Sequence, residues 1–135
     1  MKKAVLDTNV LVSGIFWRGK PNHLLERMLA LDVEISASPK MLAEYVDVID
    51  KMAGKRDARQ LAERWSERLF GRLRMVDVPA KFKACRDPKD NMFVDCALAS
   101  GTVIIVSGDD DLLSLQGIVK GVKFLTVEQA IALLK

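Results

Sequence analysis

The sequence predicts an α/β sandwich with a mainly parallel central sheet, and two features of the 135-residue chain support this. First, it contains short and mostly apolar runs that are typical of strands covered by helices on both faces. These runs are Lys3–Leu6, Val33–Ser36, Met75–Val78, Thr102–Val106 and Lys123–Leu125. Second, segments with helical periodicity lie between them, which is the order expected of strand–helix–strand units with right-handed crossovers. The length suits a single domain, so we expect residues 1–135 to form one unit.

The helices are predicted from their start signals and their apolar spacing. Ser38-Pro39 supplies a cap and a first-turn proline, and apolar residues follow at helical intervals as far as Met52. Residues 58–73 place apolar side chains on one stripe and arginines opposite, which predicts a surface helix paired with the preceding one. Thr126 to Gln129 is a capping box that opens a last helix. One helix is expected between the first two strands and a short helix before the last strand.

Composition restricts the possible functions. The net charge of +3 permits a polyanionic partner without demanding one. His23 is the only histidine, so serine–histidine catalysis and histidine-rich metal sites lack the necessary residues. Cys85 and Cys96 form no CxxC pair, so we expect two reduced thiols in a cytoplasmic protein rather than a zinc site. No apolar stretch approaches membrane-spanning length, and Asp7 and Asn9 interrupt the run after the N-terminal lysines, so neither a membrane anchor nor a secretory signal is expected.

Two carboxylates directly follow predicted strands. Asp7 closes the first strand, and Asp109 follows the fourth strand after Ser107-Gly108. Because ligands of open parallel sheets bind outside the carboxyl ends of the strands, we expect these aspartates to face each other across a cleft. Like charges at short range disfavour joint ionisation unless a cation joins them, and Mg²⁺ or Mn²⁺ is the simplest resident of an all-oxygen site. A helix cap is the structural alternative for Asp7.

Further polar residues are candidates for the same site. Glu44 borders the apolar face of the helix that starts at Pro39, although a solvated position at the edge of that face would explain it equally well. Asp90 stands at or near the start of a further predicted helix, which is apolar and ends near Ser100, and the helix dipole favours an anion there. Asp95 lies inside that apolar helix and therefore needs a partner or a metal. Asp111 points the same way as Asp109 if the chain there is still extended, and Asp110 then faces away. The remaining candidates beside these carboxylates are Ser107, Thr8 and Asn9.

At these residues the chain resembles the PIN-domain family, and closely the PIN-type toxins of toxin–antitoxin pairs. The segments that carry the resemblance are residues 5–11, Ser38-Pro39 leading to Glu44, residues 86–93 with residues 97–99, and residues 106–113. The resemblance spans nearly the whole chain and implies a single PIN-like α/β/α domain over residues 1–135. It also implies a Mg²⁺- or Mn²⁺-dependent ribonuclease, often dimeric, that is held inactive by a small antitoxin encoded beside it. By motif match, the catalytic and metal-binding residues would be Asp7, Glu44, Asp90 and Asp109, with Asp95 and Asp111 as supporting acids.

The implied chemistry is hydrolysis of RNA phosphodiester bonds by a water that a divalent ion activates. Basic side chains expected at the cleft rim are Arg18, Lys20, Arg86 and Lys89. Trp17 would stack on a base, or else lie in the core or in a dimer interface. The apolar helix over residues 39–52, together with its neighbour, predicts a homodimer that also binds the antitoxin.

Two other readings remain open at this point. The first is a catalytically inactive PIN module that binds RNA or a partner protein. The second is a phosphotransfer protein of receiver or phosphatase type, since such proteins also place aspartates at strand ends. That second reading lacks an acid two residues after Asp7, where such phosphatases carry one.

Overall fold

The structure is a computed structural model that describes residues 1–79 and 87–134. Within these ranges the strands join one parallel sheet in the order β3-β2-β1-β4-β5. The strands are β1 Lys3–Leu6, β2 Glu34–Ala37, β3 Leu73–Met75, β4 Ile104–Val106 and β5 Lys123–Leu125. The helices are α1 Thr8–Phe16, α2 Lys20–Ala30, α3 Pro39–Lys55, α4 Arg59–Phe70, α5 Asn91–Ser100, α6 Asp110–Leu113 and α7 Val127–Leu133, with a 3₁₀ turn η1 at Pro88–Asp90. The predicted α/β sandwich with a mainly parallel sheet is confirmed.

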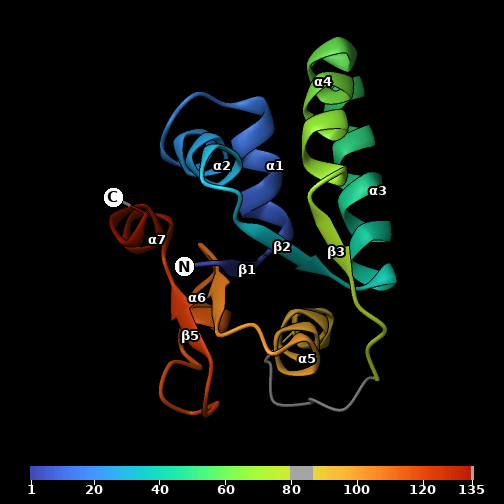
Figure 1. The fold of residues 1–135 in the computed structure, drawn as a ribbon. Helices are drawn as coiled ribbons and strands as arrows, with labels where there is room; N and C mark the ends of the chain where they lie inside the picture. Colours follow the sequence, from blue (N-terminus) through green and yellow to red (C-terminus); the bar gives the residue numbers. More distant parts are fainter. Residues whose placement is uncertain (80–86, 135) are drawn as a thin grey trace.

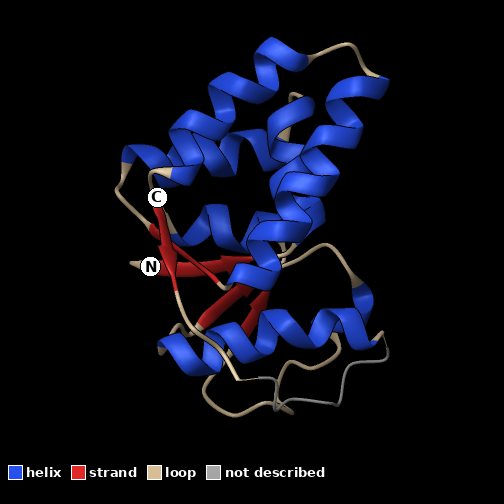
Figure 2. Cartoon of the chain, turned by 90° about the vertical axis from the view of Figure 1, so that its right-hand side faces the viewer, coloured by secondary structure: helices blue, strands red, loops and turns tan. Residues whose placement is uncertain are grey.

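Helices cover both faces of the sheet (Figures 1 and 2). Helices α1 to α4 lie on one face, where α7 packs against α2, and α5 lies on the other face. The chain adds β2 and β3 on one side of β1 and then returns through α5 to β4 on the other side. Right-handed crossovers in opposite directions place their helices on opposite faces. The connections reverse direction between the neighbours β1 and β4, so the carboxyl ends of these two strands mark the expected ligand site.

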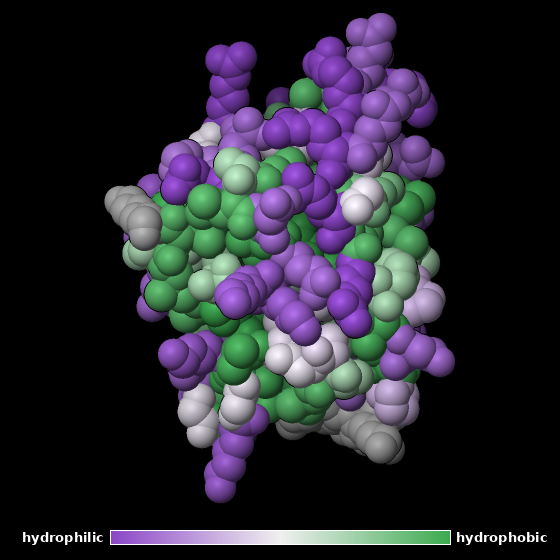
Figure 3. Space-filling view, in the orientation of Figure 1, coloured by the Kyte–Doolittle hydropathy of each residue, from purple (hydrophilic) through white to green (hydrophobic). Residues whose placement is uncertain are grey.

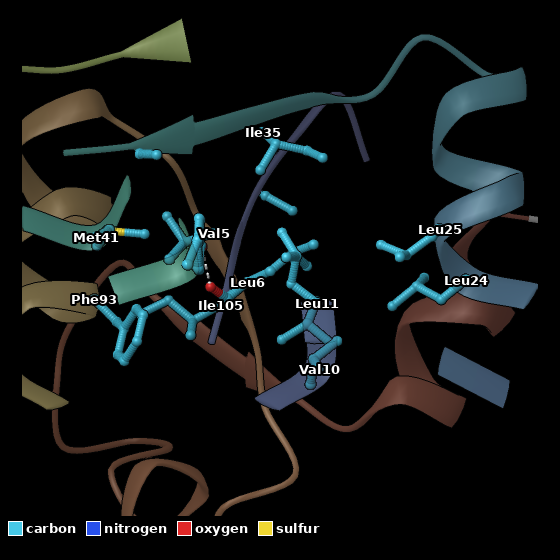
Figure 4. Close-up of a cluster of buried hydrophobic side chains, with 14 of the residues drawn as sticks. Val5, Leu6, Val10, Leu11, Leu24, Leu25, Ile35, Met41, Phe93 and Ile105 are labelled. Atoms are coloured by element: carbon cyan, nitrogen blue, oxygen red, sulfur yellow. Dashed lines mark hydrogen bonds between the residues drawn. The ribbon is translucent and has the colours of Figure 1, made fainter. Parts of the chain in front are cut away.

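The core receives apolar side chains from both layers of helices (Figure 4). Leu11 of α1 and Leu25 of α2 are fully buried on one side of β1, and Phe93 of α5 lies on the other side. Val5 and Ile105 in the two central strands have no exposed surface. Because both faces of these strands are covered, their sequences lack the alternation of polar and apolar residues.

The third strand lies earlier in the chain than predicted. β3 covers Leu73–Met75 rather than Met75–Val78, and α4 ends at Phe70 rather than at Leu73. After Phe70 the Arg72 N–H donates to the Leu69 carbonyl at 2.9 Å in a closing turn. Leu73 then pairs with Ile35 of β2. The prediction was wrong here because an apolar residue after a helix fits the end of its stripe and the start of a strand equally well.

Two helices connect β1 to β2, where the sequence predicted one. The break lies at Gly19, whose φ of 151° disfavours any other residue, and Pro21 stands in the first turn of α2. α1 and α2 then pack closely at Gly14. A Cβ atom at this position would lie 2.7 Å from Leu25 Cγ and 3.0 Å from the Pro21 carbonyl oxygen.

Hydrophilic side chains and ion pairs mark part of the surface of the helices α2 to α4. Hydrophilic side chains gather over the end where α3 meets α4, at the top of Figure 3. Two arginines of the stripe predicted on α4 contact the α2 side: Arg68 pairs with Glu26 at 2.6 Å, and Arg72 pairs with Asp32 at 2.5 Å. Among the described residues, no helix has both the length and the apolar character needed to cross a membrane.

Candidate functional site

Asp7 stands at the junction of β1 and α1. Its N–H donates to the Val106 carbonyl at 3.0 Å, so β4 fixes its backbone, and its Oδ1 accepts from the Val10 N–H at 2.8 Å. Only 4% of the residue is exposed. Burial raises the pKa of its carboxyl group, the charge of Asp109 adds to this, and the hydrogen bonds from Ser107 and Val10 oppose it. The sequence offered a helix cap and a carboxylate at the sheet edge as alternatives for Asp7, and the residue is both.

Ser107 joins the ends of the two central strands. Its Oγ donates to Asp7 Oδ2 and accepts from the Asp109 N–H at 2.9 Å. Ser107 is fully buried, and its one hydroxyl links the Asp7 carboxylate to the backbone of Asp109. This contact orients the Asp7 carboxylate.

The chain turns into α6 directly after Asp109. Asp109 Oδ1 accepts from the Asp111 N–H at 3.0 Å and caps that helix. The backbone is therefore no longer extended, and the alternation argument that aligned Asp111 with Asp109 and turned Asp110 away does not hold. Asp111 is half-buried and Asp110 is exposed.

η1 brings Asp90 to Asp109. Asp87 caps this turn by accepting from the Lys89 N–H at 3.0 Å. The pKa of Asp90 is raised to about 6, first by burial and then by the charges of Asp109 and Asp87, with a hydrogen bond to Asp109 and the charge of Asp7 adding to the effect. A carboxyl group hydrogen bonds to another carboxylate only while one of them holds a proton. Asp90 and Asp109 thus form an acid pair next to Asp7.

Glu44 reaches this corner from α3. Its Oε2 accepts from Thr8 Oγ1, and Thr8 directly follows Asp7. Thr8 is buried, whereas Asn9 is exposed. Asp95 is buried on α5, as its apolar surroundings in the sequence predicted. We define the carboxylate corner as Asp7, Glu44, Asp90 and Asp109.

The donor set of this corner suits a hard divalent cation, since every candidate ligand is an oxygen atom. Asp7 Oδ1, Asp7 Oδ2 and Asp109 Oδ1 already accept hydrogen bonds from the protein, but each carboxylate oxygen carries a second lone pair. Across residues 1–79 and 87–134, no group of three or more His, Cys, Asp or Glu side chains is spaced to hold a metal ion. The chemistry of the donors therefore fits Mg²⁺ or Mn²⁺. To coordinate one ion together, the carboxylates would have to move closer to one another.

A cleft opens beside Glu44, between the start of α3 and the segment from η1 to α5. Lys40 and Lys89 are exposed on its walls, and Asp95 also lines it. Lys89, one of the basic residues expected at the rim, thus lies on this cleft, and Arg86 lies outside the described residues. Lys40 was missed, although its place one residue after the helix-starting Pro39 could have suggested it.

The predicted rim positions of Arg18 and Lys20 are wrong. Both follow the far end of α1, a helix of 9 residues that begins beside Asp7, so a helix length of roughly 13 Å intervenes. Lys20 instead pairs with Glu128 of α7. Trp17 is 42% exposed and is therefore not a core residue, and the Arg56 guanidinium stacks 4.6 Å from its ring centroid.

Comparison with known protein families identifies the family of this chain. The model of the PIN domain matches residues 3–111, a range that includes all four carboxylates. The chain belongs to the PIN-domain family. An uncharacterized protein of Methanocaldococcus jannaschii is 30% identical over 122 residues, which cover 84% of this chain and 75% of that protein.

Two solved structures share this PIN fold. One is VapBC2 from Rickettsia felis bound to a DNA fragment from their promoter, with a TM-score of 0.63 and 17% identity over 92% of this chain and 98% of that one. The other is a protein of Pyrobaculum aerophilum, with a TM-score of 0.62 and 15% identity over 99% of this chain and 89% of that one. At these identities the likeness extends to the fold alone.

Proposed function

We propose that this PIN domain is a divalent-metal-dependent endoribonuclease that hydrolyses RNA phosphodiester bonds. The observation that carries the proposal is the carboxylate corner at the ends of β1 and β4. There Asp109 raises the pKa of both Asp7 and Asp90, and Glu44 joins through Thr8. PIN domains are generally nucleases, which supports a hydrolase at the level of the family. The phosphotransfer reading has no comparable support.

Each residue of the corner receives a role in the proposal. Asp7, Asp90 and Asp109 would hold Mg²⁺ or Mn²⁺, and Glu44 would hold a water or a second ion. The bound cation lowers the pKa of a water and neutralises charge that develops on the phosphate. Ser107 keeps the Asp7 carboxylate in place, and Thr8 does the same for Glu44. Asp95 and Asp111 support the site as neighbouring acids.

Substrate binding would fall to the cleft beside Glu44. Lys40 and Lys89 lie on its walls and would attract the phosphates of an RNA strand toward the corner. We further propose that the chain is the toxin of a toxin–antitoxin pair, acts in the cytoplasm and binds a small cognate antitoxin. Its resemblance to PIN-type toxins and the fold it shares with VapBC2 support this.

The decisive experiment is an RNA cleavage assay with Asp7→Asn. The amide keeps the shape of the side chain but binds a cation far less well, so divalent-dependent cleavage should be lost. The metal-free variant should be at least as stable as the wild type, because one charge leaves a crowded acidic cluster. Asp50→Asn is the matched control, since Asp50 is an exposed acid on α3. Cleavage by Asp7→Asn at the wild-type rate in Mg²⁺ and Mn²⁺ would end the proposal.

A second candidate is a catalytically inactive PIN module that binds RNA or a partner protein. One observation favours it, namely that no described group of three or more potential ligands has metal-holding spacing. Incubation with RNA in Mn²⁺ and in EDTA distinguishes the two candidates. The inactive module should bind RNA equally well in both and should release no fragments in either.

A further inference from the structure

Helix α3 contacts the chain on both sides of Asp7 through two consecutive residues. Glu44 accepts a hydrogen bond from the hydroxyl of Thr8, the residue after Asp7. Tyr45 donates its hydroxyl to the carbonyl oxygen of Leu6, the residue before Asp7. The backbone that carries Asp7 is thereby held from α3 at both of its neighbours.

The chemistry of Tyr45 suits a permanent hydrogen-bond donor. The residue has no exposed surface, and burial raises the pKa of its hydroxyl well above the usual range, with the charges of Asp7 and Glu44 adding to this. The hydroxyl therefore stays neutral and protonated. A buried hydroxyl needs a partner, and the Leu6 carbonyl supplies it.

The hydrogen bond lies at a place where small shifts matter. Leu6 is the last residue of β1, and the next peptide turns the chain into α1 with Asp7 as its cap. The Asp7 carboxylate is aimed by Val10 N–H on one oxygen and by Ser107 on the other. Rotation of the Leu6–Asp7 peptide would change both of these contacts together.

We propose that Tyr45 is a positioning residue for Asp7: its hydroxyl fixes the last peptide of β1 and so sets the direction of the Asp7 carboxylate. This proposal rests on the metal-dependent function proposed above, because the direction of the Asp7 carboxylate affects metal binding only if Asp7 holds a metal ion. Removing a residue that orients a metal ligand without binding the metal itself typically lowers metal affinity by about 10- to 100-fold. Tyr45→Phe keeps the ring and deletes only the hydroxyl, so it tests this role directly.

The matched control is Thr102→Val. Thr102 is also buried, and its hydroxyl lies 3.0 Å from Ser36 Oγ and 2.7 Å from Ser100 Oγ. It precedes the first residue of β4, whereas the carboxylate corner lies at the carboxyl end of that strand. Both variants lose one buried hydroxyl. If the Tyr45 hydroxyl only supports the fold, the two variants should have similar Mn²⁺ affinities and similar exchange rates of the Val10 amide.

Two measurements on the full chain decide the question. The first is Mn²⁺ binding by electron paramagnetic resonance, in which Tyr45→Phe should bind at least about 10-fold more weakly than the wild type and Thr102→Val should not. The second is hydrogen exchange of the Val10 amide in the metal-free protein, which reports on its bond to Asp7 Oδ1. This amide should exchange faster in Tyr45→Phe than in Thr102→Val.

Unchanged Mn²⁺ affinity in Tyr45→Phe, or an equal loss in Thr102→Val, would overturn the proposal. If the wild-type protein binds no Mn²⁺, the metal-dependent function fails, and the Val10 amide alone decides the role of Tyr45. An exchange rate that matches the control would then show that the hydroxyl only supports the fold.

Discussion

Asp90 binds its proton more tightly than an ordinary aspartate because it is partly buried next to Asp109. Its pKa of about 6 lies above the value of about 3.9 expected in the unfolded chain. Between these values the folded state binds more protons than the unfolded state. The contribution of this group to stability is therefore complete below pH ~4 and is lost as the pH rises through about 6.

The resulting prediction concerns the metal-free protein. We compare the unfolding temperatures of Asp90→Asn and the wild type in EDTA. The difference, variant minus wild type, should increase as the pH rises from about 4 to about 7, because the amide has no proton to lose. Melting curves followed by circular dichroism across this range supply the measurement. Asp50→Asn serves as the control and should track the wild type. A constant difference between Asp90→Asn and wild type at every pH would contradict the raised pKa.

Single residues of the site differ in how far the sequence could predict them. The positions of Asp7 and Asp109 were predictable because each lies just after the end of an apolar strand and β1 and β4 are neighbours. Tyr45 was predictable only as a core residue. Its hydrogen bond to Leu6 spans 39 positions and depends on the packing of α3 over the sheet edge, which no local pattern encodes.

At the scale of helices and strands, the contact between α1 and α2 depends on Gly14. Gly14→Ala should destabilise the protein by about 1–3 kcal/mol, because the new methyl group collides with Leu25 and with the Pro21 carbonyl. Gly54→Ala on α3 is the matched control, since its Cβ would meet only Arg59 Nη2 at 3.8 Å. That change should stabilise by roughly 0.4–1 kcal/mol. Chemical denaturation of both variants tests the pair, and equal effects would refute the packing argument.

The boundaries of elements were less predictable than their order. The capping box at Thr126 gave the start of α7 correctly, because both of its hydrogen bonds are local. The end of α4 and the start of β3 were misplaced, because Leu73 pairs with a strand 38 residues earlier. The break at Gly19 was likewise missed, since glycine and proline mark a turn without specifying that a second helix follows.

At the scale of the whole molecule, we predict that the chain forms a homodimer. α3 and α4 enclose a groove with apolar lining that includes Ile49, Ala62 and Phe70, and Val46 at its edge is 46% exposed. Sedimentation equilibrium should give twice the chain mass of 15.0 kDa. A monomer at micromolar concentration would contradict the prediction. Met41 of α3 is fully buried within the chain, so the apolar surface left for a partner is that of the groove.

The last prediction joins the carboxylate corner to global stability. A cation that binds only the folded state stabilises it by about 2.7 kcal/mol at a concentration 100 times its dissociation constant. For a chain of this length, that corresponds to an increase in unfolding temperature on the order of 10 °C. Mn²⁺ should produce this increase, and KCl at equal ionic strength should not, because screening acts weakly on partly buried charges.

The variant Asp109→Asn assigns the effect to the corner. Asp109 interacts with both Asp7 and Asp90, so its removal should lower the repulsion in the metal-free protein and also weaken the cation site. The variant should therefore melt at or above the wild-type temperature in EDTA and gain little from Mn²⁺. If Mn²⁺ stabilised Asp109→Asn as much as the wild type, the cation would bind elsewhere on the protein, and the four carboxylates would be left with a structural role.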